Sequence, residues 1–181
     1  MSTDAFVIPL KRFDLAKERL RVSNIASVTE LAKQLATQVV INCRPRHTIV
    51  LSESDEITEF ATALGCEVLQ SDATSLNDAV QRAYGTLGSR FERLIIVHGD
   101  LREPEGLGEF DPGEDVTIVT DHHGIGTNVM ALPTELDFHF AYGADSASLH
   151  RREAERLGRH VTLITDSAWR FDVDEPDDLN P

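Results

Sequence analysis

The sequence predicts an α/β fold in which helices cover both faces of a mostly parallel β-sheet. Over the first hundred residues, apolar runs of strand length alternate with segments at helical spacing, in the order β-α-β-α-β-α-β. Such alternation joins parallel strands through right-handed crossovers. The 181 residues, of which 41% are hydrophobic and 27% charged, suit one soluble domain, so residues 1–181 are predicted to form a single unit.

The first predicted strand, residues 5–8, leads into a loop rich in cations, and Pro9 sets the strand's exit. Asp14 is placed to cap a short helix over residues 15–21. The cations of this stretch are Lys11, Arg12, Lys17 and Arg19. A helix N-terminus favours an anion, and these side chains add positive charge in a chain whose formal net charge is −14. The stretch therefore predicts a phosphate site, with a solvated basic turn as the alternative.

Cap signals delimit the helices of the first half. Ser27 and Glu30 form a capping box at the start of one helix. Ser54 and Ser75 precede two others, and Gly65 follows the first of these at the usual position after a helix end. The predicted helices span about 28–43, 56–64 and 76–87, and the predicted strands span 48–52, 66–70 and 93–98.

The second half of the chain is less regular. A Gly-, Pro- and Glu-rich loop over residues 102–115 precedes two further apolar strands, residues 116–119 and 129–132. Ser146 begins a charged helix over residues 147–157. A glycine followed by Asp and Ser at a helix start is a second candidate anion site, although a plain N-cap is the simpler interpretation.

Three aspartates are candidates for cation binding. Asp100 follows the apolar run that ends at Val97 and so projects from the carboxyl edge of the sheet, where folds of this kind bind ligands. A turn or cap role is the alternative for this residue alone. Asp172 and Asp174 point to the same face of a predicted strand, with Val173 turned away. Adjacent carboxylates repel unless a cation lies between them, and oxygen ligands suit Mg²⁺ or Mn²⁺.

The composition argues against several classes of protein. Asp and Glu number 31 against 17 Lys and Arg, whereas a nucleic-acid surface needs a basic face. No window approaches ~18 uninterrupted apolar residues, so no membrane span is predicted. The N-terminal residues carry no basic segment before a long apolar core, so a cytoplasmic location is expected. Cys43 and Cys66 lack metal-site spacing and are expected to be reduced thiols.

Six motifs occur together in an order that resembles a known family. They are PLKxxxxAKxRL from residue 9, SLNDAV from residue 75, VHGDL from residue 97, GTNVMAL from residue 126, YGADS from residue 142 and FDVDEPDDL from residue 171. Together they look like the guanylyltransferases of deazaflavin-coenzyme biosynthesis, which are named for 2-phospho-L-lactate guanylyltransferase and include relatives that use phosphoenolpyruvate or 3-phosphoglycerate. The resemblance runs almost end to end. It implies a Rossmann-like nucleotidyltransferase fold, the three-layer αβα arrangement of the nucleotide-diphospho-sugar transferase type.

The resemblance also implies roles for individual residues. The implied sets are Lys11, Lys17 and Arg19 for the GTP triphosphate, Asn77 for the nucleoside, Asp100, Asp172 and Asp174 for one or two Mg²⁺ ions, and Thr127, Gly143 and Ser146 for the phosphorylated three-carbon acid. Lys11, Lys17 and Asp100 would be the catalytic residues. A homodimer is among the assemblies that this reading allows, and a downstream deazaflavin transferase would be a metabolic neighbour.

The implied reaction needs little chemistry from the protein. A phosphate monoester with a second pKa of about 6 is already an anionic nucleophile at neutral pH. It would attack the α-phosphorus of GTP in line, and pyrophosphate would leave. Catalysis would then consist of positioning and of charge neutralisation by the metal and the lysines.

Two departures from the family pattern leave alternatives open. Arg102 stands where the family usually has Pro, and the acidic loop that follows, to Asp115, has no match in the pattern. One alternative is a related nucleotidyltransferase that uses another base or acceptor, such as a sugar phosphate or a molybdopterin-type cofactor. Those relatives normally carry a Gly-rich LxxGxGxR loop, which this sequence lacks after its first strand. The other alternative is a non-catalytic nucleotide-binding protein, which has less need of a crowded acid pair.

Overall fold

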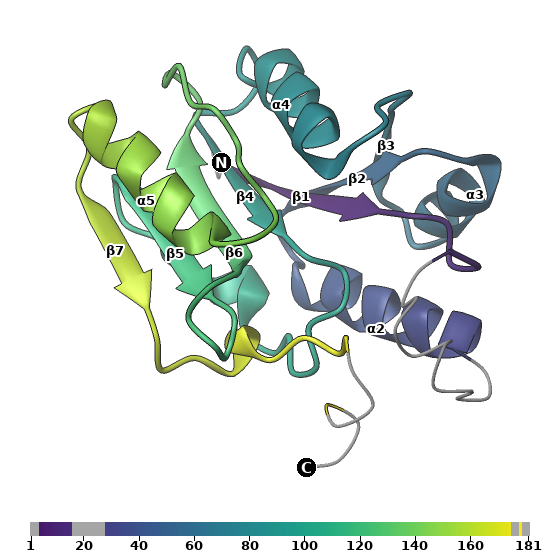
Figure 1. The fold of residues 1–181 in the computed structure, drawn as a ribbon. Coiled ribbons are helices and arrows are strands. Elements are labelled where there is room, and N and C mark those ends of the chain that lie inside the picture. The colour runs from purple at the N-terminus through teal and green to yellow at the C-terminus, as the bar shows by residue number, and fades with distance from the viewer. Residues whose placement is uncertain (1–3, 16–27, 175–177, 179–181) are drawn as a thin grey trace.

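The computed structural model describes residues 4–15, 28–174 and 178 (Figure 1). The strands are β1 (Asp4–Leu10), β2 (His47–Ser52), β3 (Glu67–Gln70), β4 (Arg93–Val97), β5 (Val116–Thr120), β6 (Thr127–Pro133) and β7 (Val161–Ile164). The helices are α2 (Val28–Asn42), α3 (Asp55–Ala63), α4 (Leu76–Leu87) and α5 (Ser146–Arg156), with short 3₁₀ helices η1 (Leu107–Glu109) and η2 (Ala168–Arg170). Within these residues, no helix has the length and apolarity that crossing a bilayer requires.

All the strands form one sheet in the order β3-β2-β1-β4-β6-β5-β7, which confirms the predicted α/β class. The β1, β2, β3 and β4 strands are parallel to their neighbours in the first half, and β7 is parallel to β5. Only β6 runs antiparallel to both of its neighbours. It follows β5 through a short turn, and a connection that short can only join antiparallel strands.

Side chains of β1 alternate between two separate hydrophobic clusters, one on each face of the sheet. Phe6 and Ile8 pack with buried residues of α2 and α3, whereas Ala5 and Val7 pack with buried residues of α4 and α5. Figure 1 shows α2 on one side of the sheet and α4 with α5 on the other. The protein is therefore built in three layers, as the family resemblance implied.

The predicted caps of two helices are confirmed. The Ser54 hydroxyl accepts a hydrogen bond from the Ile57 N–H at 3.4 Å, and the Ser75 hydroxyl accepts one from the Asp78 N–H at 3.2 Å. Gly65 has φ +76°, the left-handed conformation that terminates a helix at low cost. Leu15, the first residue of the helix predicted over 15–21, lies in a turn, and the rest of that prediction lies outside the described residues. So do the predicted capping residue Ser27 and the cations Lys17 and Arg19.

Two predictions about strands were wrong in detail, and one strand was missed. Pro9 lies inside β1 instead of ending it; pairing with β4 ends at Val7, so a residue without an N–H is tolerated there. The β7 strand was not predicted, because it is a four-residue edge strand with two exposed side chains and so lacks a strong apolar signal. The segment around Asp172 forms only an isolated bridge with Leu101 instead of a regular strand.

The acidic loop over residues 102–115 is anchored in the core. Leu107 is fully buried there, and Phe110 contacts the ring of Trp169 edge-on with centroids 5.0 Å apart. A Cβ atom on Gly108 would lie 1.9 Å from the Arg44 carbonyl oxygen, so the two backbone segments approach too closely for a side chain. The loop thus ties the end of α2 to the C-terminal segment.

Candidate active site

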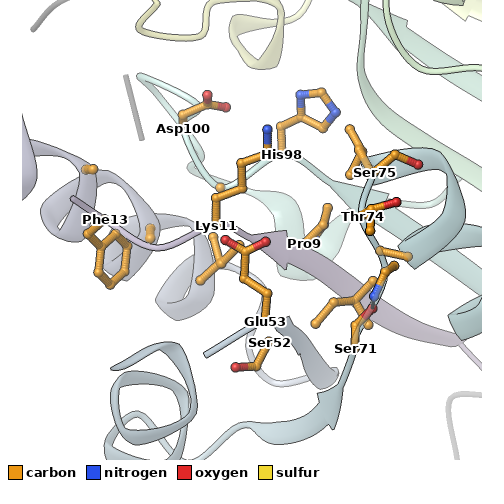
Figure 2. A pocket seen from close by; sticks show the side chains of 18 of the residues that line it. Pro9, Lys11, Phe13, Ser52, Glu53, Ser71, Thr74, Ser75, His98 and Asp100 are labelled. Atoms are coloured by element: carbon orange, nitrogen blue, oxygen red, sulfur yellow. Dashed lines mark hydrogen bonds between the residues drawn. The ribbon is translucent and has the colours of Figure 1, made fainter. Parts of the chain in front are cut away.

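A cavity of about 310 Å³ opens at the carboxyl ends of β1, β2, β3 and β4 (Figure 2). Its lining consists of Pro9, Leu10, Lys11, Phe13, Ala32, Ala36, Leu51, Ser52, Glu53, Ser71, Ala73, Thr74, Ser75, Leu76, Ala79, His98, Gly99, Asp100 and Asp174. The chain crosses from β1 to β2 on one side and to β4 on the other, so this edge is a topological switch point. Open α/β sheets bind their ligands at such points.

The loop after β1 presents one cation to this cavity. Lys11 lines it, and Figure 2 shows its side chain extending toward Asp100 and His98. Arg12 instead pairs with Asp14 at 2.6 Å on the exposed side of the loop. Phe13 is buried and anchors the loop against the ring of Phe60, 4.9 Å away between centroids. The structure therefore separates two cations that the sequence placed together.

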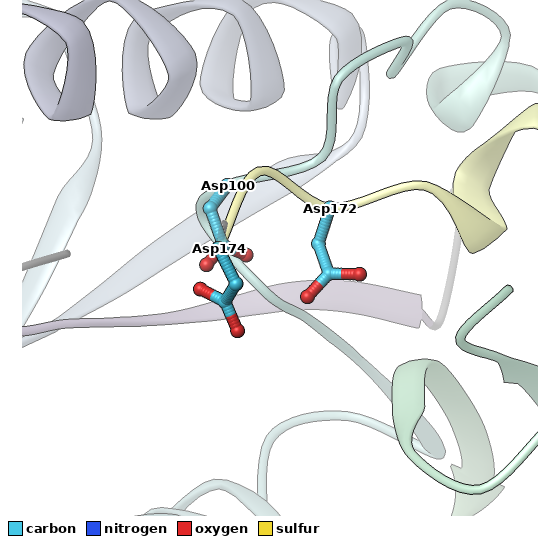
Figure 3. Close-up of side chains that lie close together, drawn as sticks. All are labelled: Asp100, Asp172 and Asp174. Atoms are coloured by element: carbon cyan, nitrogen blue, oxygen red, sulfur yellow. The ribbon is translucent and has the colours of Figure 1, made fainter. Parts of the chain in front are cut away.

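The three predicted metal-binding aspartates converge in one cluster (Figure 3), and two of them, Asp100 and Asp174, also line the cavity. Carboxylate oxygens of Asp100, Asp172 and Asp174 all lie within 4.8 Å of one another. Two main-chain hydrogen bonds hold the distant segments together. The Val173 N–H donates to the Asp100 carbonyl at 3.1 Å, and the Arg102 N–H donates to the Phe171 carbonyl at 2.8 Å. Close contact between these segments is what assembles the acidic cluster.

Side-chain alternation around residue 173 follows the prediction even without a regular strand. Val173 is 2% exposed and packs against Val28, Leu31 and Leu35 at the start of α2. Its burial holds the C-terminal segment against α2, and the aspartates on either side of it join Asp100 in the cluster. The predicted shared face of the two aspartates is therefore present.

The three carboxylates of the cluster are crowded, and Asp172 is partly buried. Burial, and then the charges of Asp100 and Asp174, raise the pKa of Asp172. Asn128 opposes this shift by donating a hydrogen bond to the Asp172 carboxylate at 3.3 Å. Three crowded carboxylates offer only oxygen ligands, and a divalent cation would relieve their repulsion. This donor set fits Mg²⁺.

Thr127 and Ser146, predicted to bind the acid, lie in a buried network. The Ser146 hydroxyl donates to the Thr127 hydroxyl at 3.2 Å, and Thr127 lies 3.1 Å from His150 Nδ1. The Ala141 N–H donates to His150 Nε2 at 2.9 Å, so the ring carries its proton on Nδ1. Burial lowers the pKa of His150 to about 4, which keeps it neutral. Both hydroxyls bond within the protein, and neither residue is among those lining the cavity in the described part of the chain.

Asn77 and Gly143 lie at the junction between α4 and α5. The Asn77 side chain accepts from the Tyr142 N–H at 2.6 Å and donates to the Tyr142 carbonyl at 3.0 Å. Gly143 follows with φ +123° and is exposed. The amide of Asn77 thus positions the segment before α5, while its neighbours Ser75 and Leu76 line the cavity. Direct contact of Asn77 with a nucleoside stays a prediction.

Several cavity residues were not singled out from the sequence. Ser52 is the last residue of β2, Glu53 and His98 directly follow β2 and β4, and Thr74 lies between β3 and α4. Their position at or beyond the end of a parallel strand was the available signal, because those ends share one edge of the sheet.

The family model described as guanylyl transferase CofC like matches residues 4–181. The chain belongs to this CofC-like guanylyl transferase family. Phosphoenolpyruvate guanylyltransferase of Chloroflexus aurantiacus is 30% identical over 96% of this chain and 91% of its own length. The 3-phospho-D-glycerate guanylyltransferase of Colwellia psychrerythraea is 27% identical, with 96% and 88% covered. The 2-phospho-L-lactate guanylyltransferase of Methanosphaera stadtmanae is 24% identical, with 96% and 80% covered.

Solved structures place this CofC-like chain among the nucleotidyltransferases by fold. A nucleotidyl transferase from Methanothermobacter thermautotrophicus superposes with a TM-score of 0.67 at 16% identity, covering 97% of this chain and 93% of that one. A 4-diphosphocytidyl-2C-methyl-D-erythritol synthase from Anaerococcus prevotii gives a TM-score of 0.66 at 9% identity, covering 98% and 93%. At these identities the likeness concerns the fold alone.

Proposed function

We propose that this protein transfers GMP from GTP to the phosphate of a small phosphorylated three-carbon acid and releases pyrophosphate. The observation that carries the proposal is that Lys11 and the aspartate cluster lie at the same end of the cavity at the topological switch point. The names of the curated relatives give the nucleotide and the class of acceptor. We take residues 1–181 to act as one nucleotidyltransferase domain in the cytoplasm.

We assign the triphosphate to the cationic end of the cavity. Lys11 reaches into it from the end of β1, and we expect Lys17 and Arg19, which follow in the chain, to contribute further charge. The nucleoside would then extend toward the ends of β2 and β3, where the lining is largely apolar or small and includes Leu51 and Ala79. An apolar floor suits the faces of a base.

Asp100, Asp172 and Asp174 would hold Mg²⁺, which when bound would neutralise charge on the phosphates near the reacting centre. Burial and then the neighbouring carboxylates raise the pKa of Asp172 in the protein itself, and a bound cation would offset both effects. Preorganised charge of this kind is the usual source of electrostatic catalysis.

The reaction joins an oxygen of the acceptor phosphate to the α-phosphorus of GTP. The bond between that phosphorus and the bridging oxygen breaks, and the electron pair leaves with pyrophosphate. No general base is needed, because a phosphate monoester has a second pKa of about 6 and is already anionic. The Lys11 ammonium would offset charge that develops on the leaving group.

We assign the acceptor to Thr127, Gly143 and Ser146. Since the Ser146 hydroxyl bonds to that of Thr127, and Thr127 also bonds to His150, we expect the two hydroxyls to shape the acceptor site rather than to lose their present partners. Phosphoenolpyruvate is the first acceptor to test, because relatives 23–30% identical to this chain carry that name. We also propose that the protein forms a homodimer and that a deazaflavin transferase uses its product.

The test is pyrophosphate release by the purified protein with GTP and Mg²⁺. Phosphoenolpyruvate, 2-phospho-L-lactate and 3-phosphoglycerate are offered separately, with ATP and CTP as nucleotide controls and EDTA as the metal control. GTP-dependent release with one acid supports the proposal. Release with a sugar phosphate alone would favour a different acceptor class, and GTP binding without release under any condition would favour a non-catalytic role.

A further inference from the structure

The cavity contains a carboxylate that the proposed reaction does not use. Among its lining residues, Asp100 and Asp174 belong to the metal-binding cluster, and Glu53 does not. Glu53 follows β2, which is separated from β4 by β1 in the sheet. Two interstrand spacings of about 4.8 Å place the two strand ends roughly 10 Å apart. Figure 2 shows Glu53 and Asp100 on opposite sides of Lys11.

The protein backbone holds the Glu53 carboxylate in place. Its Oε1 atom accepts a hydrogen bond from the Arg12 N–H at 3.0 Å, across 41 residues of sequence. A carboxylate has about four acceptor positions, so one such bond leaves most of its capacity for a ligand. A group that is oriented before the ligand arrives loses less freedom on binding.

The serine hydroxyls at this end of the cavity already have partners. Ser52 donates to the Ser54 carbonyl at 2.7 Å, Ser71 accepts from the Ala73 N–H at 3.3 Å, and the Ser75 hydroxyl caps α4. These hydroxyls shape turns and a helix start. Among the described lining residues at this end, Glu53 therefore supplies the charged side chain that can recognise the polar edge of a ligand.

We propose that Glu53 selects the guanine base by accepting hydrogen bonds from its N1–H and its 2-amino group. This inference rests on the proposed function, which puts the base at this end of the cavity. Guanine presents two adjacent donors on that edge, and an ionised carboxylate only accepts, so the pairing is complementary. Adenine presents an unprotonated nitrogen at the same position, which a carboxylate repels. Glu53 would thus act as a specificity determinant and leave the reacting atoms to other residues.

The test combines a change in the protein with a change in the nucleotide. GTP, ITP (which lacks the 2-amino group) and ATP are compared in the wild type and in Glu53→Gln, by direct titration and by kcat/KM. A lost charge-assisted hydrogen bond corresponds to roughly a 10- to 100-fold effect. We expect the wild type to prefer GTP over ITP by about that factor, and Glu53→Gln to weaken GTP strongly and ITP much less. The Gln side chain can still accept a hydrogen bond from the Arg12 N–H, so we expect the loop after β1 to retain its conformation.

Glu56→Gln is the matched control. Glu56 also accepts from a main-chain N–H of this loop, that of Phe13 at 3.3 Å, but it does not line the cavity. A purely structural contribution of either residue should change binding of all three nucleotides by the same factor. We therefore expect the control to leave the ratio of GTP to ITP unchanged.

Four results would overturn the assignment of Glu53. Equal losses for GTP and ITP would mean that the residue only supports the loop. Tighter binding of all three nucleotides by Glu53→Gln would mean that the carboxylate occupies a phosphate position on the Arg12 N–H. An unchanged preference in an active variant would remove Glu53 alone and leave the proposed function standing, whereas a wild type that binds no GTP would refute both.

Discussion

Replacing Asp172 with Asn should abolish nucleotidyl transfer and at the same time stabilise the metal-free protein. Both effects arise at one carboxylate, because the charge that would hold Mg²⁺ is disfavoured by burial and then by Asp100 and Asp174 when no cation is present. Asn keeps the shape of Asp and an oxygen that can accept from Asn128. Active sites that hold like charges close together commonly lower the stability of the protein for the sake of activity.

The size of the effect follows from the geometry. Two unit charges 4.8 Å apart repel by about 0.9 kcal/mol in bulk water and by about 3.5 kcal/mol at an effective dielectric constant of 20. Asp172 has two such neighbours, so the total repulsion is about 2 kcal/mol even with the dielectric constant of bulk water. For a chain of this length we expect the Tm of the Asp172→Asn variant to rise by about 4–8 °C.

The pH dependence carries a definite sign. In the folded protein the pKa of Asp172 is raised above its unfolded value near 3.9. At pH values between the unfolded and the folded pKa, the folded state therefore binds a proton at Asp172 more readily than the unfolded state does. Wild-type stability at this site therefore falls as pH rises through that window. The advantage of Asp172→Asn should be largest at neutral pH and should shrink as pH falls toward about 4.

Thermal and urea unfolding in EDTA, at pH 5 and pH 8, measure the stability, and pyrophosphate release measures the activity. Added Mg²⁺ should raise the Tm of the wild type and have little effect on the variant. Asp166→Asn is the control, since Asp166 is exposed on the same C-terminal segment and should change stability by less than about 0.5 kcal/mol. A variant that is less stable than the wild type in EDTA, or that remains active, would refute the reasoning.

Three further changes test other parts of the structure. Lys11→Ala should weaken GTP binding roughly 10- to 100-fold through a lost charge-assisted contact, and an unchanged dissociation constant by titration would count against the phosphate assignment. Gly108→Ala should lower the free energy of unfolding by about 1–3 kcal/mol or more, because its Cβ would meet the Arg44 carbonyl at 1.9 Å; urea unfolding that matches the wild type would contradict this. Because the pKa of His150 is lowered to about 4 from near 6.5 when unfolded, stability should fall as pH drops through that range, and His150→Gln should flatten the dependence. An equally steep profile in that variant would assign the effect to other groups.

Local features of this protein were predictable from its sequence. Helix starts at Ser54 and Ser75 depend on a hydroxyl and an N–H three residues later, which a sequence shows directly. Alternation around Val173 is equally local, and it placed both neighbouring aspartates on one side before any sheet partner was known. The parallel order of the first half followed from alternating strands and helices, and with it the expectation of a site at the carboxyl edge.

Tertiary structure decided what depends on contacts between distant segments. The antiparallel bridge between Leu101 and Asp172 brings the C-terminal aspartates to Asp100, and no spacing in the sequence encodes that pairing. Burial of the Thr127 hydroxyl beside His150 is likewise set by the packing of α5 on the sheet. The bond that orients Glu53, from the Arg12 N–H 41 residues away, also depends on the packing of the loop after β1 against the end of β2. Periodicity and capping act over a few residues, whereas these contacts are specified by how the whole core packs.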